Sequence, residues 1–278
     1  MIPPFIREFL IKALEEDMPY GDITTEACVP EGHFSRARAI AKEHLVVCGL
    51  AVAREVFKLL DPSVEFNPLK KDGDEVDEGD VLFFVEGPTR AILSGERVAL
   101  NLLQRLSGIA TLARAFVKAI EGTMAKLLDT RKTTPTLRYL EKYAVRTGGG
   151  LNHRFSLSDA ILIKDNHIKA AGGIKEAIKR AKTVAGPTKI IEVEVENIVQ
   201  LKDALEEGVH MVMLDNMDLE DIKKAVQICR QRGDIKIEVS GGITIDNVRQ
   251  VAETGVDYIS SGAITHSAKA VDISLEID

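Results

Sequence analysis

Charged and small polar residues recur at the ends of short apolar runs in the second half of the chain. The runs end, in order, in Asp129-Thr130-Arg131-Lys132, Lys164-Asp165-Asn166-His167, Glu194, Asp215-Asn216, Ser240-Gly241-Gly242 and Ser261-Gly262. Scattered polar residues follow strands in any protein, because loops face water. One shared site better explains the two cationic clusters, the two carboxylates and the two glycine turns that occur on successive strand–helix units.

The cations in this set are Arg131, Lys132, Lys164 and the pair His153-Arg154. An arginine guanidinium binds a carboxylate or phosphate through two parallel hydrogen bonds, and a lysine acts as a point charge. The cluster therefore predicts a substrate with several negative charges. His153 lacks a partner at HExxH-type spacing, which favours a hydrogen-bonding role over metal ligation.

The carboxylates are Glu194 and Asp215, at the ends of the third and fourth runs. Such a pair could bind ribose hydroxyls, hold Mg²⁺ or act as acid and base. The residue types alone do not decide among these three roles.

The two glycine turns each precede an expected helix. Small residues let backbone N–H groups approach an anion, and a helix N-terminus adds favourable partial charge. Barrels often bind a phosphate at their last two strand–loop junctions. We therefore expect a phosphate at Ser240-Gly241-Gly242 and Ser261-Gly262.

Strands and helices alternate from about residue 109, which predicts a parallel α/β sheet. The expected strands are Ala125–Asp129, Ala160–Lys164, Lys189–Val195, Met211–Asp215, Lys236–Ser240 and Tyr258–Ser261. An open doubly wound sheet and a barrel both fit this alternation. A barrel is favoured because functional groups recur at each strand end, and those ends line one mouth of a β/α barrel.

Several helix starts are predicted from capping residues. Thr134-Pro135 provides an N-cap and a proline at the first helical position, and Asn197, Asp218 and Thr244 are expected caps for three later helices. Ser94 is expected to cap a long helix in the first part of the chain. Before that helix, an amphipathic helix is predicted over residues 5–16, with strands and turns over 35–49 and 63–92.

Composition excludes several classes of protein. The 278 residues carry 36 Lys+Arg against 43 Asp+Glu, a net charge of −7, so nucleic-acid binding is not expected. The three cysteines have no CxxC spacing, which fits a reducing cytoplasm. No apolar run reaches the roughly 18 residues that span a bilayer, and acidic residues interrupt any signal peptide, so no membrane association is expected.

Longer strings of residues carry a resemblance to a known family. They are Glu16-Asp17, 21–25, Glu96-Arg97, 101–111, 129–135, 140–145, 148–154, 163–167 and 240–243. These strings cover the chain from end to end and closely resemble quinolinate phosphoribosyltransferase, also called nicotinate-nucleotide diphosphorylase. The family usually has Gly where Thr136 stands, and often Gly or Asn at Ser156, which affects loop detail beside the site.

The resemblance implies an N-terminal α/β sandwich domain over 1–108 and a C-terminal incomplete TIM-like α/β barrel over 109–265. The tail, 266–278, is expected to pack back on the first domain. The implied enzyme is a pentosyltransferase of NAD biosynthesis. It transfers phosphoribosyl from phosphoribosyl pyrophosphate (PRPP) to quinolinate with decarboxylation, giving nicotinate mononucleotide, pyrophosphate and CO₂, and needs Mg²⁺.

The resemblance also implies roles for residues. The expected catalytic residues are Lys132, Lys164, Glu194 and Asp215, with Glu194 and Asp215 as Mg²⁺ ligands through PRPP. The expected substrate-binding set adds Arg105, Thr130, Arg131, His153, Arg154, Ser240, Gly241, Gly242, Ser261 and Gly262. The family arginine matching Arg105 reaches the site from a neighbouring subunit, which implies a homodimer and leaves assembly into hexamers open.

Two other functions remain as alternatives. One is a molybdenum-transport-associated relative with the same fold, the same Asp-Thr-Arg-Lys string and another substrate. The intact Asn152-His153-Arg154 and 164–167 strings favour quinolinate over it. The other is a non-catalytic phosphosugar-binding protein, which would need little of the carboxylate set.

Overall fold

The computed structural model describes residues 2–278 and divides into two compact units. The first contains the chain up to Leu112, Pro135–Gly148 and Ala268–Asp278. The second contains Ala113–Thr134 and Gly149–Ser267. Compared with the expected boundaries, 109–112 and 135–148 group with the first unit instead of the barrel, and 266–267 group with the barrel instead of the tail.

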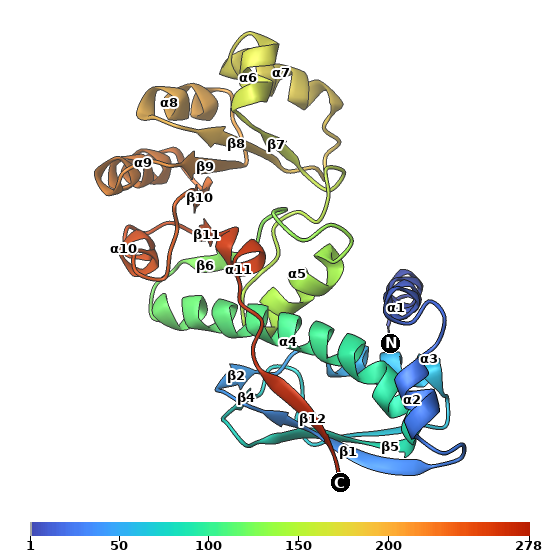
Figure 1. The fold of residues 1–278 in the computed structure, drawn as a ribbon. Helices are drawn as coiled ribbons and strands as arrows, with labels where there is room; N and C mark the ends of the chain where they lie inside the picture. Colours follow the sequence, from blue (N-terminus) through green and yellow to red (C-terminus); the bar gives the residue numbers. More distant parts are fainter. Residues whose placement is uncertain (1) are drawn as a thin grey trace. The chain divides into compact units, whose positions relative to one another are not determined.

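The first unit is built on a four-stranded antiparallel sheet in the order β12-β1-β5-β3. Its strands are β1 (Phe34–Ala41), β3 (Glu65–Pro68), β5 (Val81–Pro88) and β12 (Ile273–Ile277), and β2 (Leu45–Val46) pairs with β4 (Glu75–Val76). Its helices are α1 (Pro4–Asp17), α2 (Ile23–Cys28), α3 (Leu50–Leu60), the first part of α4 (Thr89–Ala119) and α5 (Arg138–Thr147). The C-terminal strand β12 lies beside β1 (Figure 1), so the tail completes this sheet.

Periodicity explains these elements. Ile6, Leu10 and Leu14 bury one face of α1, as the amphipathic pattern predicts. In β1, Ala37, Ala39 and Ala41 alternate with more exposed residues and bury one face of the strand.

The second unit contains six parallel strands in the order β6-β11-β10-β9-β8-β7. They are β6 (Lys126–Leu128), β7 (Ile161–Ile163), β8 (Ile191–Val195), β9 (Met211–Asp215), β10 (Lys236–Ser240) and β11 (Tyr258–Ser260). The helices between them are α6 (Asp165–Ala171), α7 (Ile174–Val184), α8 (Ile198–Glu206), α9 (Leu219–Arg232), α10 (Val248–Ala252) and α11 (Ala263–His266). Neighbouring helices α8, α9 and α10 lie side by side along the outer side of the strands (Figure 1). This is the incomplete α/β barrel that was expected.

Capping predictions were correct for two helices. The Asn197 side chain accepts hydrogen bonds from the backbone N–H groups of Val199 and Gln200 at the start of α8. The Asp218 side chain accepts from the backbone N–H of Asp221 at the start of α9.

Three other predicted starts were wrong. Helix α4 begins at Thr89, and the Ser94 hydroxyl lies inside it and donates to Asp22. Helix α5 begins at Arg138, because Thr136 adopts a left-handed conformation (φ 69°) that no helix accommodates. Before α10, the Asn247 side chain accepts from the N–H of Thr244 and forms a turn that delays the helix until Val248.

Candidate active site

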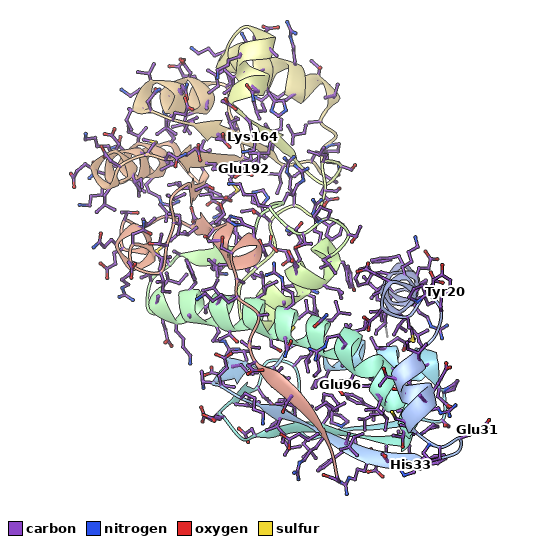
Figure 2. All side chains as sticks on the ribbon, viewed as in Figure 1. Tyr20, Glu31, His33, Glu96, Lys164 and Glu192 are labelled. Carbon is purple, nitrogen blue, oxygen red and sulfur yellow. The ribbon has the colours of Figure 1, made fainter. Side chains whose placement is uncertain are left out.

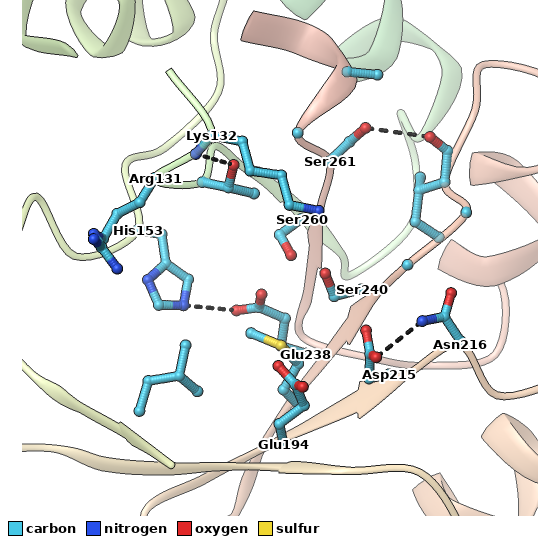
Figure 3. Close-up of a pocket in the computed structure, with 18 of the residues that line it drawn as sticks. Arg131, Lys132, His153, Glu194, Asp215, Asn216, Glu238, Ser240, Ser260 and Ser261 are labelled. Atoms are coloured by element: carbon cyan, nitrogen blue, oxygen red, sulfur yellow. Dashed lines mark hydrogen bonds and ion pairs between the residues drawn. The ribbon is translucent and has the colours of Figure 1, made fainter. Parts of the chain in front are cut away.

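The carboxyl ends of the barrel strands surround a cavity of about 650 Å³. Every residue of the second unit that the sequence placed in the site lines this cavity. They are Thr130, Arg131, Lys132, His153, Arg154, Lys164, Glu194, Asp215, Ser240, Gly241, Gly242, Ser261 and Gly262. Figure 3 shows most of the charged members converging from different strands. The structure therefore brings these residues of the second unit together around one cavity.

Arg105 belongs to the first unit and is not among the residues that line this cavity. Its guanidinium contacts the carboxylate of Glu141 at 2.9 Å and donates to the carbonyl of Ala268 at 2.7 Å. Glu141 is fully buried, so this ion pair is largely withdrawn from water.

The surroundings of Arg154 in the cavity destabilise its charge. Partial burial and the nearby charge of Arg131 lower the pKa of Arg154. The Arg154 guanidinium also donates to the carbonyl of Ala160 at 2.9 Å, which fixes its position. Because like charges repel at short range, a bound dianion would stabilise this arrangement.

The Lys132 backbone is held by two hydroxyl groups from different strand ends. Its N–H donates to the hydroxyl of Thr130, and its carbonyl accepts from the hydroxyl of Thr265, at 3.0 and 2.8 Å. The ammonium group lies among Ser240, Ser260 and Ser261 in Figure 3. This strand end therefore directs a positive charge toward the two glycine turns.

The carboxylates lie on neighbouring strands β8 and β9. Glu194 is 8% exposed and forms an ion pair with the ammonium group of Lys164. Asp215 accepts from the side-chain amide of Asn216 at 2.9 Å. Figure 2 marks Lys164 at the barrel strands of the second unit, and Figure 3 shows Glu194 and Asp215 near each other. Parallel pairing of β8 with β9 brings these two carboxylates together.

The glycine turns bring backbone close to the cavity. Gly241 has φ 89°, and a Cβ added there would lie 2.3 Å from the side-chain oxygen of Asn216. A Cβ at Gly262 would lie 2.8 Å from Cδ of Lys132 and 3.1 Å from the His266 ring. A side chain at Gly241 would be strained and would collide with Asn216, and a side chain at Gly262 would displace the Lys132 chain. The two glycines therefore keep the backbone accessible to an anionic group.

A buried cluster of titratable groups lies behind the cations. The Nε2 atom of His153 lies 3.0 Å from a carboxylate oxygen of Glu192 and 3.4 Å from one of Glu238. Burial disfavours the charged imidazole, but these two carboxylates outweigh burial and raise the pKa of His153 to about 10. Burial itself raises the pKa of Glu238. The cluster as a whole thus retains a proton at neutral pH.

Sequence reasoning missed several lining residues. Glu238, Ser260 and His266 also face the cavity. Glu238 precedes Ser240 by two residues on β10, so the alternation of strand side chains was the signal that could have found it. His266 becomes part of the cavity only through the short helix α11, and no spacing in the sequence predicts that.

Glu194 and Asp215 fit a magnesium ion that is held mainly by a substrate. Mg²⁺ prefers oxygen ligands and is commonly bound through one or two carboxylates plus substrate phosphates. Both residues line the cavity and offer carboxylate oxygens there. The His153–Glu192–Glu238 cluster fits less well, because its imidazole nitrogen and carboxylates already share a proton.

The fold and cavity define an α/β-barrel enzyme that takes strongly anionic small molecules, with cations, carboxylates and glycine turns at one barrel mouth. Two family models match the chain: the N-terminal domain of quinolinate phosphoribosyl transferase over residues 22–107, and its C-terminal domain over 109–276. The chain therefore belongs to the quinolinate phosphoribosyltransferase family.

Similar proteins agree over nearly the full length. A probable nicotinate-nucleotide pyrophosphorylase [carboxylating] of Bacillus subtilis is 47% identical, covering 94% of this chain and 90% of that protein. Its counterpart in Methanocaldococcus jannaschii is 46% identical, covering 100% and 99%. The crystal structure of NadC from Streptococcus pyogenes superimposes with a TM-score of 0.95 at 44% identity, covering 100% and 98%. Among the described residues, no helix has the length and apolar character to cross a membrane.

Proposed function

We infer that this enzyme transfers the phosphoribosyl group of PRPP to the ring nitrogen of quinolinate and releases pyrophosphate, CO₂ and nicotinate mononucleotide. It is a pentosyltransferase of NAD biosynthesis. The observation that carries this function is the single cavity that joins the predicted cations, carboxylates and glycine turns in a chain of this family.

Quinolinate is a dianion and requires cations for both carboxylates. Arg131 and Arg154 offer guanidinium groups on one side of the cavity, and Lys164 offers an ammonium group from the end of β7. His153 lies beside Arg154 in the same wall. Because an arginine pair binds planar carboxylates in two-point fashion, these residues would orient the pyridine ring as well as hold it.

PRPP presents a 5-phosphate, a ribose and a pyrophosphate. The 5-phosphate would lie on the backbone of Gly241, Gly242 and Gly262, where side chains are missing. Lys132 would neutralise part of the pyrophosphate. Glu194 and Asp215 would bind the ribose hydroxyls and stabilise positive charge at C1 as the pyrophosphate leaves.

The reaction needs no covalent nucleophile from the protein. The bond from C1 to pyrophosphate breaks, and the ring nitrogen forms the new bond to C1. The nitrogen is then cationic and stabilises the electron pair that stays on the neighbouring carbon when CO₂ leaves, and that carbon uses the pair to take a proton. Catalysis therefore consists mainly of positioning and electrostatic stabilisation.

Magnesium is part of this proposal. Glu194 and Asp215 would hold it together with PRPP, and when bound it supplies charge neutralisation to the leaving pyrophosphate. We expect EDTA to abolish turnover and added Mg²⁺ to restore it. Full turnover in EDTA would contradict this part of the proposal.

The experiment that tests the function follows quinolinate consumption by the purified enzyme. Loss of quinolinate should require PRPP and should be matched by equal amounts of pyrophosphate and CO₂. Tight binding of both compounds without turnover would instead support a phosphosugar-binding protein. Turnover of PRPP with a different acid only would support a relative with another substrate.

We further propose that the enzyme is a homodimer in which Arg105 completes the partner's site. Arg105 is a conformationally fixed cation, because Glu141 and the carbonyl of Ala268 hold its guanidinium. A quinolinate dianion would gain a further ion pair from it. Assembly of such dimers into a hexamer is compatible with this arrangement.

A further inference from the structure

Glu238 is a buried carboxylate that the reaction described above does not use. It is fully buried in the middle of β10, and yet it lines the cavity. On the neighbouring strand β9, Met213 pairs with it in register and separates it from Glu194 on β8. Glu238 therefore does not belong to the carboxylate pair proposed for PRPP.

A buried carboxylate is a poor choice for stability alone. Removing a charge from water costs several kcal/mol, and apolar replacements of buried ion pairs are often neutral or stabilising. Glu238 and Glu192 together place two such groups around one imidazole. A functional requirement explains this arrangement better than packing does.

The contacts of His153 show what that requirement is. Its Nε2 atom faces both carboxylates, and Figure 3 shows the ring directed at Glu238. Its Nδ1 atom lies 2.7 Å from the backbone nitrogen of Arg154. Its own backbone N–H donates to Asp129 at 2.8 Å. The ring is thus fixed at both nitrogens and connects the carboxylates to the backbone of Arg154.

We propose that Glu238 is a positioning residue that, together with Glu192, fixes the ring of His153 and through it Arg154 for binding of the substrate carboxylates. This inference rests on the proposed function, since it takes quinolinate as the ligand of Arg154. Glu238 acts at a distance from the reacting atoms. Its effect should therefore appear in quinolinate binding more than in the chemical step.

The protonation of His153 should determine how quinolinate binding depends on pH. The charged groups around the His153 ring are Glu192 on β8, Glu238 on β10, Asp129 after β6, and the neighbouring Arg131 and Arg154. With both glutamates in place, the cluster keeps its proton below pH 10. Removing one carboxylate lowers the pKa of His153. The variant would therefore lose this proton at a lower pH than wild type does.

The test compares Glu238→Gln with wild type and with Glu196→Gln, a matched control on an exposed residue just after β8. Glu238→Gln should raise the KM for quinolinate about tenfold or more, because losing a group that orients a ligand-binding residue commonly weakens binding by that factor. The KM for PRPP and the kcat at saturating quinolinate should stay within about twofold. Glu196→Gln should match wild type, and Glu238→Asp should recover part of the affinity because it retains the charge.

Two further readouts separate positioning from a merely structural role. The quinolinate KM of wild type should be constant from pH 6 to 8, whereas that of Glu238→Gln should rise with pH. The melting temperature of Glu238→Gln should stay close to that of wild type, because Glu192 still pairs with His153. An unchanged quinolinate KM in a folded Glu238→Gln enzyme would overturn the proposal, as would equal losses in kcat and in affinity for both substrates. Wild-type turnover is measured first, so failure of the proposed function is seen separately.

Discussion

Arg131 and Arg154 show how individual residues prepare the cavity for an anion. Partial burial and the nearby charge of Arg131 lower the pKa of Arg154, so two like charges lie close together in the cavity. Lys164 is compensated by Glu194, whereas Lys132 directs its charge toward the glycine turns. A bound anionic substrate would reduce the repulsion between Arg131 and Arg154. It would also supply a negative partner to Lys132.

The lysines provide a direct residue-scale prediction. Lys132→Ala and Lys164→Ala should each lower kcat roughly 100-fold or more, because Lys132 would neutralise the leaving pyrophosphate and Lys164 would hold the attacking quinolinate in position. Circular dichroism should show that both variants remain folded. Wild-type turnover in either variant would refute the electrostatic account of catalysis.

Thr136 provides a prediction about stability. A β-branched residue at φ 69° is strained, and glycine is not. Thr136→Gly should therefore raise the free energy of unfolding by about 1 kcal/mol, reduced somewhat by the greater freedom of glycine in the unfolded chain. Urea unfolding measures this.

Thr136→Ala is the control for that experiment. Alanine keeps a Cβ at the same backbone angle, so it should give little or no stabilisation. If Thr136→Gly were less stable than wild type and Thr136→Ala, the side chain at position 136 would stabilise the fold by more than the backbone strain destabilises it.

At the scale of elements, the six barrel strands were predictable because each is a short apolar run that ends in polar residues. The convergence of their ends followed from parallel pairing. Helix starts were predictable only where a side chain caps locally, as at Asn197 and Asp218. Ser94 failed because its hydroxyl bonds a distant residue, Asp22, and sequence does not show that contact.

The Gly241 turn gives the prediction at this scale. Gly241→Ala should raise the KM for PRPP at least roughly tenfold, because the new methyl group would collide with Asn216 and reshape the turn. The quinolinate KM should change little. Steady-state kinetics with each substrate varied separately measures both effects.

Gly255→Ala is the matched control. Gly255 has the same φ of 89° and lies outside the cavity, and an added Cβ there would meet only Val226 at 3.7 Å. Gly255→Ala should therefore introduce the same backbone strain without raising the KM for PRPP. Equal losses of PRPP affinity in both variants would show that strain in the barrel, rather than the shape of the turn, explains the result.

At the scale of the whole molecule, the chain returns to its first unit after completing the barrel. Strand β12 pairs with β1, and the pairing joins residues more than two hundred positions apart. Local patterns could suggest a strand there but not its partner. The dimer proposal concerns Arg105, which belongs to this first unit and is held there by Glu141 and the carbonyl of Ala268.

Mixed dimers test that proposal. Arg105→Gln and Lys132→Ala should each be nearly inactive alone. After subunits are mixed and exchanged, heterodimers carry one site with neither substitution, so activity should return to roughly a quarter of wild type. A mixture that stays inactive, although exchange is demonstrated by differently tagged subunits, would place Arg105 in the site of its own chain.

A crystal structure with quinolinate and a non-reactive PRPP analogue bound would show directly whether the cavity at the barrel mouth binds both substrates. The two quinolinate carboxylates should lie on Arg131, Arg154 and Lys164, and the 5-phosphate on the backbone of Gly241, Gly242 and Gly262. Ligands bound elsewhere, or seated in the cavity without contact to these cations, would contradict this prediction.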